Sequence, residues 1–148
     1  ITMLLESRLP IKAVTVMIQK EAADRLCTPV GSRDSGAITV CTNYYAQVKQ
    51  LFNVSRGSFM PAPNVDSTVI RLDIRAEPAV KVSDEKKFFK MVKAAFAQRR
   101  KTALNSISSG MGIGKTQVAE ALRASGLEEN VRAEKLTMDE LATLCENL

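Results

Sequence analysis

Histidine and tryptophan are absent from the 148-residue chain, and aromatic residues make up only 5% of it. Without histidine there can be no Ser-His-Asp or Cys-His nucleophile pair, no HExxH site and no imidazole general base. The three cysteines lie far apart, at Cys27, Cys41 and Cys145, which excludes a standard four-ligand zinc site. We therefore expect no metal, and we interpret the cysteines as reduced, buried thiols of a cytoplasmic protein.

Long apolar runs are also missing. None approaches the roughly 20 residues that a bilayer-spanning helix needs, so we expect no membrane association. The residues from Ile1 to Arg8 lack the basic start and the cleavage site of a signal peptide. Because the chain opens inside an apolar stretch without an initiator methionine, we expect it to be a piece of something longer.

Positive charge exceeds negative charge, with a net value of +5 at pH 7. The excess is concentrated in residues 81–101, which carry eight basic residues against Asp84 and Glu85. Such a concentration suggests an anionic partner.

The first 76 residues mix short strands with helices. Ala13–Ile18 is a continuous β-branched apolar run, which is typical of a strand buried on both faces and internal in its sheet. We predict further strands at Leu51–Val54 and Ser67–Ile74. We predict helices at Ile1–Ser7, Lys20–Cys27 and Ala37–Gln50. This half resembles the last third of an α/β sheet, cut at its amino-terminal side.

The second half is entirely helical by pattern, after a linker at Ala76–Val82 that divides the chain into residues 1–76 and 77–148. Ser83 is a plausible N-cap for a long helix that runs from Asp84 to about Ile107. A second helix is expected near Thr116–Ser125. The last helix has a capping box formed by Thr137 and Glu140, with Leu136 and Leu141 as its hydrophobic staple.

A glycine-rich segment, Gly110–Thr116, superficially resembles a phosphate-binding loop. Its spacing fails because Ser109 stands where the first glycine should be, and a basic helix rather than a buried strand precedes it. We therefore reject a nucleotide hydrolase and interpret the segment as a turn between helices, with Thr116 capping the second.

The helix predicted at Asp84–Ile107 carries one apolar and one basic face. The basic face contains no acidic residue that could form i,i+4 ion pairs, and its members are Lys86, Lys90, Lys93, Arg100 and Lys101. It could be an ordinary solvated surface, but a stripe of one sign favours contact with a nucleic-acid backbone. Arg99 projects toward the apolar face, so it should pair with a carboxylate at the domain junction or reach the ligand.

Phe59 lies in a loop stiffened by Pro61 and Pro63. Such a loop could hold its ring in place for stacking on a flipped base. The alternative is a phenylalanine tucked into the core. Asp66 and Ser67 form a polar turn into the next strand, which we interpret as structural.

Four blocks of the sequence carry a family resemblance: residues 16–26, residues 57–69, residues 94–102 and the segment from Arg132 to Leu136. Together they resemble the bacterial dimethyladenosine transferases, which methylate small-subunit ribosomal RNA. The resemblance covers essentially the whole chain, and one departure is Ala103, where the family more often has leucine.

The resemblance implies the last strands of a Rossmann-like class I methyltransferase sheet followed by a small all-helical RNA-binding domain. It also implies transfer of methyl groups from S-adenosylmethionine to the amines of two adjacent adenosines in the pre-30S subunit, with Phe59 stacking on the target base. The family's glycine-rich cofactor loop and Asn-Leu-Pro-Tyr motif have no counterpart here. We therefore expect no cofactor-binding residues in this chain, and an inactive fragment when it is alone. The rival hypothesis is a non-catalytic RNA-binding module for ribosome assembly.

Overall fold

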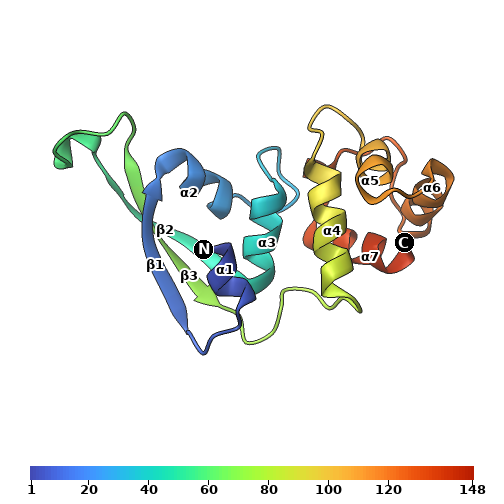
Figure 1. The fold of residues 1–148 in the computed structure, drawn as a ribbon, viewed down its shortest axis with the longest axis horizontal. Helices are drawn as coiled ribbons and strands as arrows, with labels where there is room; N and C mark the ends of the chain where they lie inside the picture. The colour runs from blue at the N-terminus through green and yellow to red at the C-terminus, as the bar shows by residue number, and fades with distance from the viewer.

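Three strands form one antiparallel sheet in the computed structural model, which describes residues 1–148 (Figure 1). They are β1 (Ala13–Gln19), β2 (Ala46–Val54) and β3 (Ser67–Ile74), in the spatial order β1-β3-β2. Both outer strands pair with β3 in antiparallel fashion, so they run parallel to each other on either side of it.

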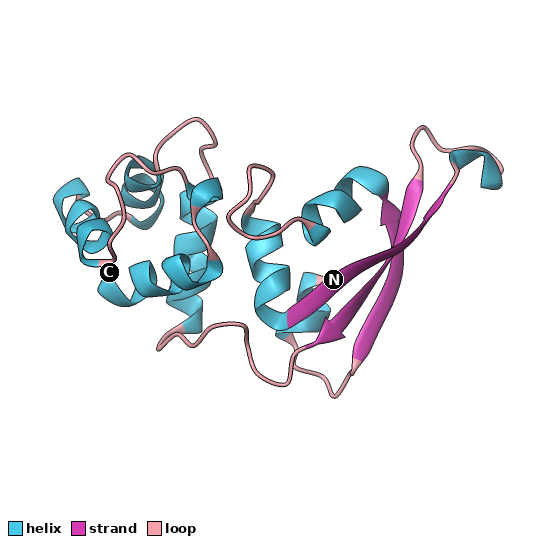
Figure 2. Cartoon of the chain, turned by 180° about the vertical axis from the view of Figure 1, so that it is seen from behind, coloured by secondary structure: helices cyan, strands magenta, loops and turns pink.

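Helices cover only one face of this sheet (Figure 2). They are α1 (Thr2–Glu6), α2 (Lys20–Cys27) and α3 (Ala37–Tyr45). The small core beneath them includes Ile70 and Leu72 of β3, both fully buried. The opposite face carries exposed apolar side chains, among them Phe52. The fold is therefore mixed α/β with a helical part after it, as the sequence predicted.

Strand β1 does not have the two buried faces that we predicted. Val16 and Ile18 are half-buried toward the helices, whereas Met17 is 49% exposed on the other face. β1 is also an edge strand, because it pairs with β3 and with no other strand of this chain. The apolar side chains of this run therefore lie on two different faces, one that the helices cover and one that is exposed to solvent.

The helix predicted at Ala37–Gln50 was too long. Helix α3 ends at Tyr45, and Ala46 already has the extended backbone of β2. Ala46 and Val48 fit the two-residue period of a strand as well as the helical period, so the spacing alone was ambiguous. Residues 46–54 form a strand because they pair with β3.

Four helices enclose the larger hydrophobic core. They are α4 (Glu85–Phe96), α5 (Ala103–Met111), α6 (Lys115–Ala124) and α7 (Met138–Asn147). Helix α7 begins at the predicted capping box: Glu140 N–H donates to Thr137 Oγ1 at 3.2 Å, and Thr137 N–H donates to Glu140 Oε1 at 3.1 Å. Leu136 and Leu141 are fully buried.

The single helix predicted from Asp84 to Ile107 is in fact two helices. Asp84, rather than Ser83, caps α4, and Thr102 caps α5 by accepting a hydrogen bond from Asn105 N–H at 3.3 Å. The break lets α5 fold back across α4. At Gly110 the helices approach so closely that a Cβ atom would lie 2.6 Å from the Cβ of Ala94, so the crossing requires glycine.

The glycine-rich segment is a connection between helices, as predicted, although its details differ. Helix α5 extends to Met111 and ends at Gly112, which has the left-handed φ of 66° that favours glycine. Gly114, not Thr116, occupies the N-cap position of α6.

The free edge of β1 leads to a prediction about self-association. Unpaired backbone groups on an edge strand recruit other strands, and a charged side chain on the strand opposes this. We expect the chain to self-associate, and Met17→Lys to shift it toward monomer in sedimentation velocity experiments. Met3→Lys, on an exposed residue of α1, is the matched control and should have little effect. A monomeric wild type at all concentrations would contradict the prediction.

Candidate functional site

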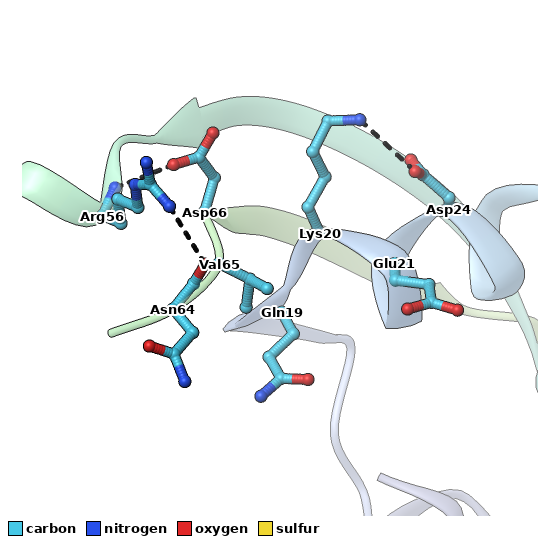
Figure 3. Close-up of a pocket in the computed structure, with 8 residues that line it drawn as sticks. All are labelled: Gln19, Lys20, Glu21, Asp24, Arg56, Asn64, Val65 and Asp66. Atoms are coloured by element: carbon cyan, nitrogen blue, oxygen red, sulfur yellow. Dashed lines mark hydrogen bonds and ion pairs between the residues drawn. The ribbon is translucent and has the colours of Figure 1, made fainter. Parts of the chain in front are cut away.

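A polar pocket lies where β1 runs into α2, opposite the loop that joins β2 to β3 (Figure 3). Its volume is about 440 Å³. The residues that line it are Gln19, Lys20, Glu21, Asp24, Arg56, Asn64, Val65 and Asp66. The strand end and the loop thus form its two walls.

Asp66 fastens the loop at its base. Its carboxylate accepts a hydrogen bond from Arg56 N–H at 2.9 Å, and its carbonyl accepts one from Lys20 N–H at 3.0 Å. Arg56 Nη1 also donates to the carbonyl of Asn64 at 3.3 Å. These contacts tie both ends of the loop to the start of α2, which agrees with the structural role predicted for Asp66.

The pocket is not built for an anion. Its three carboxylates, those of Glu21, Asp24 and Asp66, outnumber its two cations. One cation, Lys20, is paired with Asp24 at 3.4 Å. This balance disfavours phosphate and suits a neutral ligand that offers hydrogen-bond donors, such as the edge of a base.

Phe59 lies at the tip of the same loop, directly after the short 3-10 turn η1 (Arg56–Ser58). Its side chain is half-buried and belongs to neither hydrophobic core. It is not among the residues that line the pocket at the base of the loop. The structure therefore places the ring outside both cores, on a loop whose base is held by hydrogen bonds.

All six basic residues selected from the sequence are exposed, and none has a carboxylate within 4.0 Å. Lys86, Lys90 and Lys93 lie on α4. We predicted that Arg100 and Lys101 lie on the same helix, and this is wrong because α4 ends at Phe96. They lie with Arg99 in the segment 97–102. The basic residues are divided between a helix and a loop.

The three lysines of α4 face the first part of the chain. Together with Glu6, Tyr45, Glu85 and Phe89 they line a cavity of about 480 Å³. Arg99 lines a separate pocket beside Phe96 and the start of α3. The carboxylate partner that we considered for Arg99 is not present within 4.0 Å. These four cations, the three lysines and Arg99, thus lie at the junction between the two parts of the molecule.

Glu85 joins three segments across this junction. Arg8 Nη2 lies 2.6 Å from each carboxylate oxygen, and the buried Tyr44 hydroxyl donates to Oε1 at 2.9 Å. Burial, together with the hydrogen bond to Glu85, raises the pKa of Tyr44 well above its usual value, so the phenol stays a neutral donor. Arg8 has a left-handed φ of 51°, which is uncommon for a side chain of this size.

Four aromatic rings surround this network. Tyr44 and Tyr45 at the end of α3 contact Phe88 and Phe89 of α4, with ring centroids 5.0–5.7 Å apart. Such contacts stabilise helix packing beyond the area that they bury. They fix α4, and therefore its lysines, against α3.

The sequence did not reveal this network. Arg8, Tyr44 and Glu85 are far apart in the chain, and each is unremarkable in its local pattern. Only tertiary structure brings them together.

No helix in the structure combines the length and the apolar character that crossing a membrane requires. The structure also contains no group of three or more histidine, cysteine, aspartate or glutamate side chains suited to hold a metal ion.

The three-stranded sheet with helices on one face and a helical part after it is an arrangement shared with RNA methyltransferases of the Rossmann-like class. A dimethyladenosine transferase from Plasmodium falciparum superimposes with a TM-score of 0.71 over 95% of this chain and 58% of its own, at 20% identity. The 23S rRNA methyltransferase ErmE gives a TM-score of 0.64 over 95% of this chain and 57% of its own, at 25% identity.

The chain belongs to the ribosomal RNA adenine dimethylase family, whose sequence model matches residues 1–148. The ribosomal RNA small subunit methyltransferase A of Alkaliphilus oremlandii is 46% identical over 97% of this chain. Its counterpart in Geobacillus thermodenitrificans is 47% identical over 95% of it. These alignments cover 50% and 49% of the relatives, so the chain spans about half of their length.

The Glu85 network predicts a specific loss of stability. Glu85→Ala leaves the buried Tyr44 hydroxyl without its acceptor, which should lower the free energy of unfolding by about 1–3 kcal/mol. Glu85→Gln keeps an acceptor oxygen and should cost less than half as much. Urea denaturation measures both. Glu120→Ala, at an exposed position of α6, is the control, and an equal effect there would contradict the assigned role.

Proposed function

We propose that this chain is the RNA-binding half of an enzyme that dimethylates two adjacent adenosines of small-subunit ribosomal RNA. Residues 1–76 supply the end of the catalytic domain, and residues 77–148 supply a helical RNA-binding domain. The observation that carries the RNA-binding role is a set of six exposed basic residues without carboxylate partners, of which Lys86, Lys90, Lys93 and Arg99 line cavities at the junction of the two parts. Cations without carboxylate partners remain available to neutralise RNA phosphates.

An enzyme is favoured over a non-catalytic assembly module because relatives that are 46% and 47% identical carry the name methyltransferase. S-adenosylmethionine supplies the methyl group in this class of enzyme. The residues of this chain do not fit it, since none of its three strands is followed by a glycine-rich turn into a helix. We assign cofactor binding to the part of the relatives that this chain does not span, and we expect the isolated chain to be inactive.

Phe59 is the residue that we assign to the target base. Methyl transfer to an exocyclic amine requires the base to be held in a fixed plane at attacking distance. A ring on a loop that is anchored through Asp66 can provide that plane by stacking. The neighbouring pocket, with its surplus of carboxylates, can accept hydrogen bonds from a neutral base but repels the phosphate, which favours the base in this place.

The lysines of α4 should control RNA affinity. Reversing charge with Lys90→Glu and Lys93→Glu together should weaken binding at least tenfold for RNAs of different sequence. The slope of log affinity against log salt should fall by about 0.7–0.9 for each lost phosphate contact. Titrations of labelled RNA at several salt concentrations measure both quantities.

The matched control is Lys115→Glu with Lys135→Glu, which makes the same change in net charge at exposed positions elsewhere in the helical part. It should retain most of the affinity. Equal losses of RNA affinity in the two double variants would show that net charge, and not the position of the lysines, determines binding. No loss of affinity in either double variant would show that the α4 lysines are an ordinary solvated surface.

Phe59 gives the sharper test of the catalytic assignment. In an enzyme that joins this chain to the cofactor-binding half of a relative, Phe59→Ala should lower methylation at least tenfold. The reason is that base stacking contributes about 1–3 kcal/mol. Phe59→Tyr should retain most of the activity because the ring face survives. Phe52→Ala, at an exposed aromatic of β2, should have little effect.

Stability and cofactor affinity should barely change in Phe59→Ala, and thermal unfolding and cofactor titration check this. If Phe59→Ala unfolds the enzyme while the remaining folded fraction is fully active, the ring has a structural role and the assignment is wrong.

A further inference from the structure

A small pocket lies at the junction, between the start of α3 and the segment that follows α4. Its volume is about 220 Å³. The first turn of α3 forms one wall, and Phe96 and Arg99 form another. Arg25 of α2, Asp34 and Ser35 complete it. Both parts of the molecule therefore contribute to this pocket, which the comparisons do not assign.

The first turn of α3 is uncapped. The first N–H groups of any helix lack intrahelical partners, and an N-cap side chain usually accepts hydrogen bonds from them. Here the N-cap is Gly36, which has no side chain to do so. Thr39 Oγ1 instead accepts from Gly36 N–H at 3.0 Å and donates to the carbonyl of Arg25 at 2.8 Å. The turn is thus held in place while its own N–H donors, at residues 37–39, stay free.

Ser35 provides an independent sign of a missing ligand. It is 3% exposed and lines this pocket, yet its hydroxyl has no hydrogen-bond partner. Buried polar groups without partners are rare in folded proteins. An acceptor bound in the pocket would satisfy the hydroxyl. The other buried hydroxyl without a partner, that of Thr42, is not among the lining residues.

The charges of the pocket favour an anion. Arg99 is exposed and has no carboxylate within 4.0 Å, and Arg25 forms only an exposed pair with Glu21 at 3.2 Å. The positive end of the α3 dipole adds to these guanidinium groups. Asp34 opposes them as the one carboxylate among the lining residues. A phosphate oxygen matches this set of donors in charge and in hydrogen-bonding type.

We infer that this pocket binds one backbone phosphate of RNA, held by the first turn of α3, the Ser35 hydroxyl and Arg99. The inference rests on the proposed function and extends it. Both parts of the molecule bind the RNA backbone, because the lysines of α4 and the start of α3 contact the same RNA strand. Arg99, which found no carboxylate partner, then has the ligand role that the sequence left open.

Gly36→Asp tests the inference because it separates stability from binding. Gly36 has an extended backbone that any residue can adopt, and a Cβ atom there would meet no atom within 4 Å. Aspartate is a strong N-cap, so its carboxylate would take the free N–H groups and repel a phosphate. The thermal midpoint should rise, whereas affinity for a labelled RNA hairpin with two adjacent adenosines in its loop should fall about tenfold.

Gly114→Asp is the matched control. Gly114 is the N-cap of α6, also has an extended backbone without a side-chain cap, and also offers open space to a Cβ atom. The variant should gain stability in the same way and keep its RNA affinity within about twofold. Asp34→Asn should strengthen binding by removing the opposing charge, and Arg99→Gln should weaken it.

A direct readout comes from the amide resonances of residues 37–39 during titration with inorganic phosphate and, separately, with the RNA hairpin. Both should shift these amides in the wild type and neither in Gly36→Asp. If RNA binding depends on Lys90 and Lys93 but is unchanged in Gly36→Asp, the inference is wrong and the proposed function stands. Shifts with inorganic phosphate but not with RNA would also overturn it. If the wild type binds no RNA, both the inference and the proposed function are wrong.

Discussion

One carboxylate, that of Glu85, bonds the start of helix α4 to two segments of the first part of the chain. It accepts hydrogen bonds from Arg8 and Tyr44, which come from segments far away in the chain. Because Tyr44 is buried among aromatic rings, the loss of this acceptor would leave its hydroxyl unsatisfied. The network also holds Arg8 in a left-handed backbone conformation that it would otherwise rarely adopt. The junction of the two parts is therefore a defined interface, which keeps the α4 lysines turned toward the first part of the chain.

This interface fixes where the basic residues lie relative to the loop that carries Phe59. The loop that carries Phe59 projects from one end of the molecule, and the helical part forms the other (Figure 1). Between them lie the lysines of α4 and the segment 97–102. On the proposed function, RNA bound along this junction extends from the helical part toward the loop that presents the target base. The phosphate contacts would then orient the RNA strand. The carboxylates of the pocket at the base of the loop would repel phosphate groups, so that a base rather than the backbone lies there.

Local sequence signals predicted a good part of this structure. The capping box at Thr137 and the alternation at Ser67–Ile74 are short-range features, and both were confirmed. The errors arose where partners distant in sequence decide the outcome. Residues 46–50 became strand because β3 pairs with them. The long helix is two helices, and α5 packs on α4 through a close crossing that Gly110 permits. The Phe59 loop was identified from the sequence, but the partners of Glu85 and the pocket beside Arg99 depend on tertiary contacts that no local pattern reports.

Helix α3 connects these features, although it is only nine residues long. Its last turn carries Tyr44, which binds Glu85 at the start of α4, and its first turn lines the pocket that Arg99 shares. Thr39 and Asn43 fasten the helix to the carbonyl groups at the end of α2. A rigid helix that is bonded to both parts transmits a displacement at one of its ends to the other. The orientation of α4 and the geometry of the pocket are therefore not independent, and a change that breaks the hydrogen bond between Tyr44 and Glu85 would also shift Arg99 relative to the free N–H groups of α3.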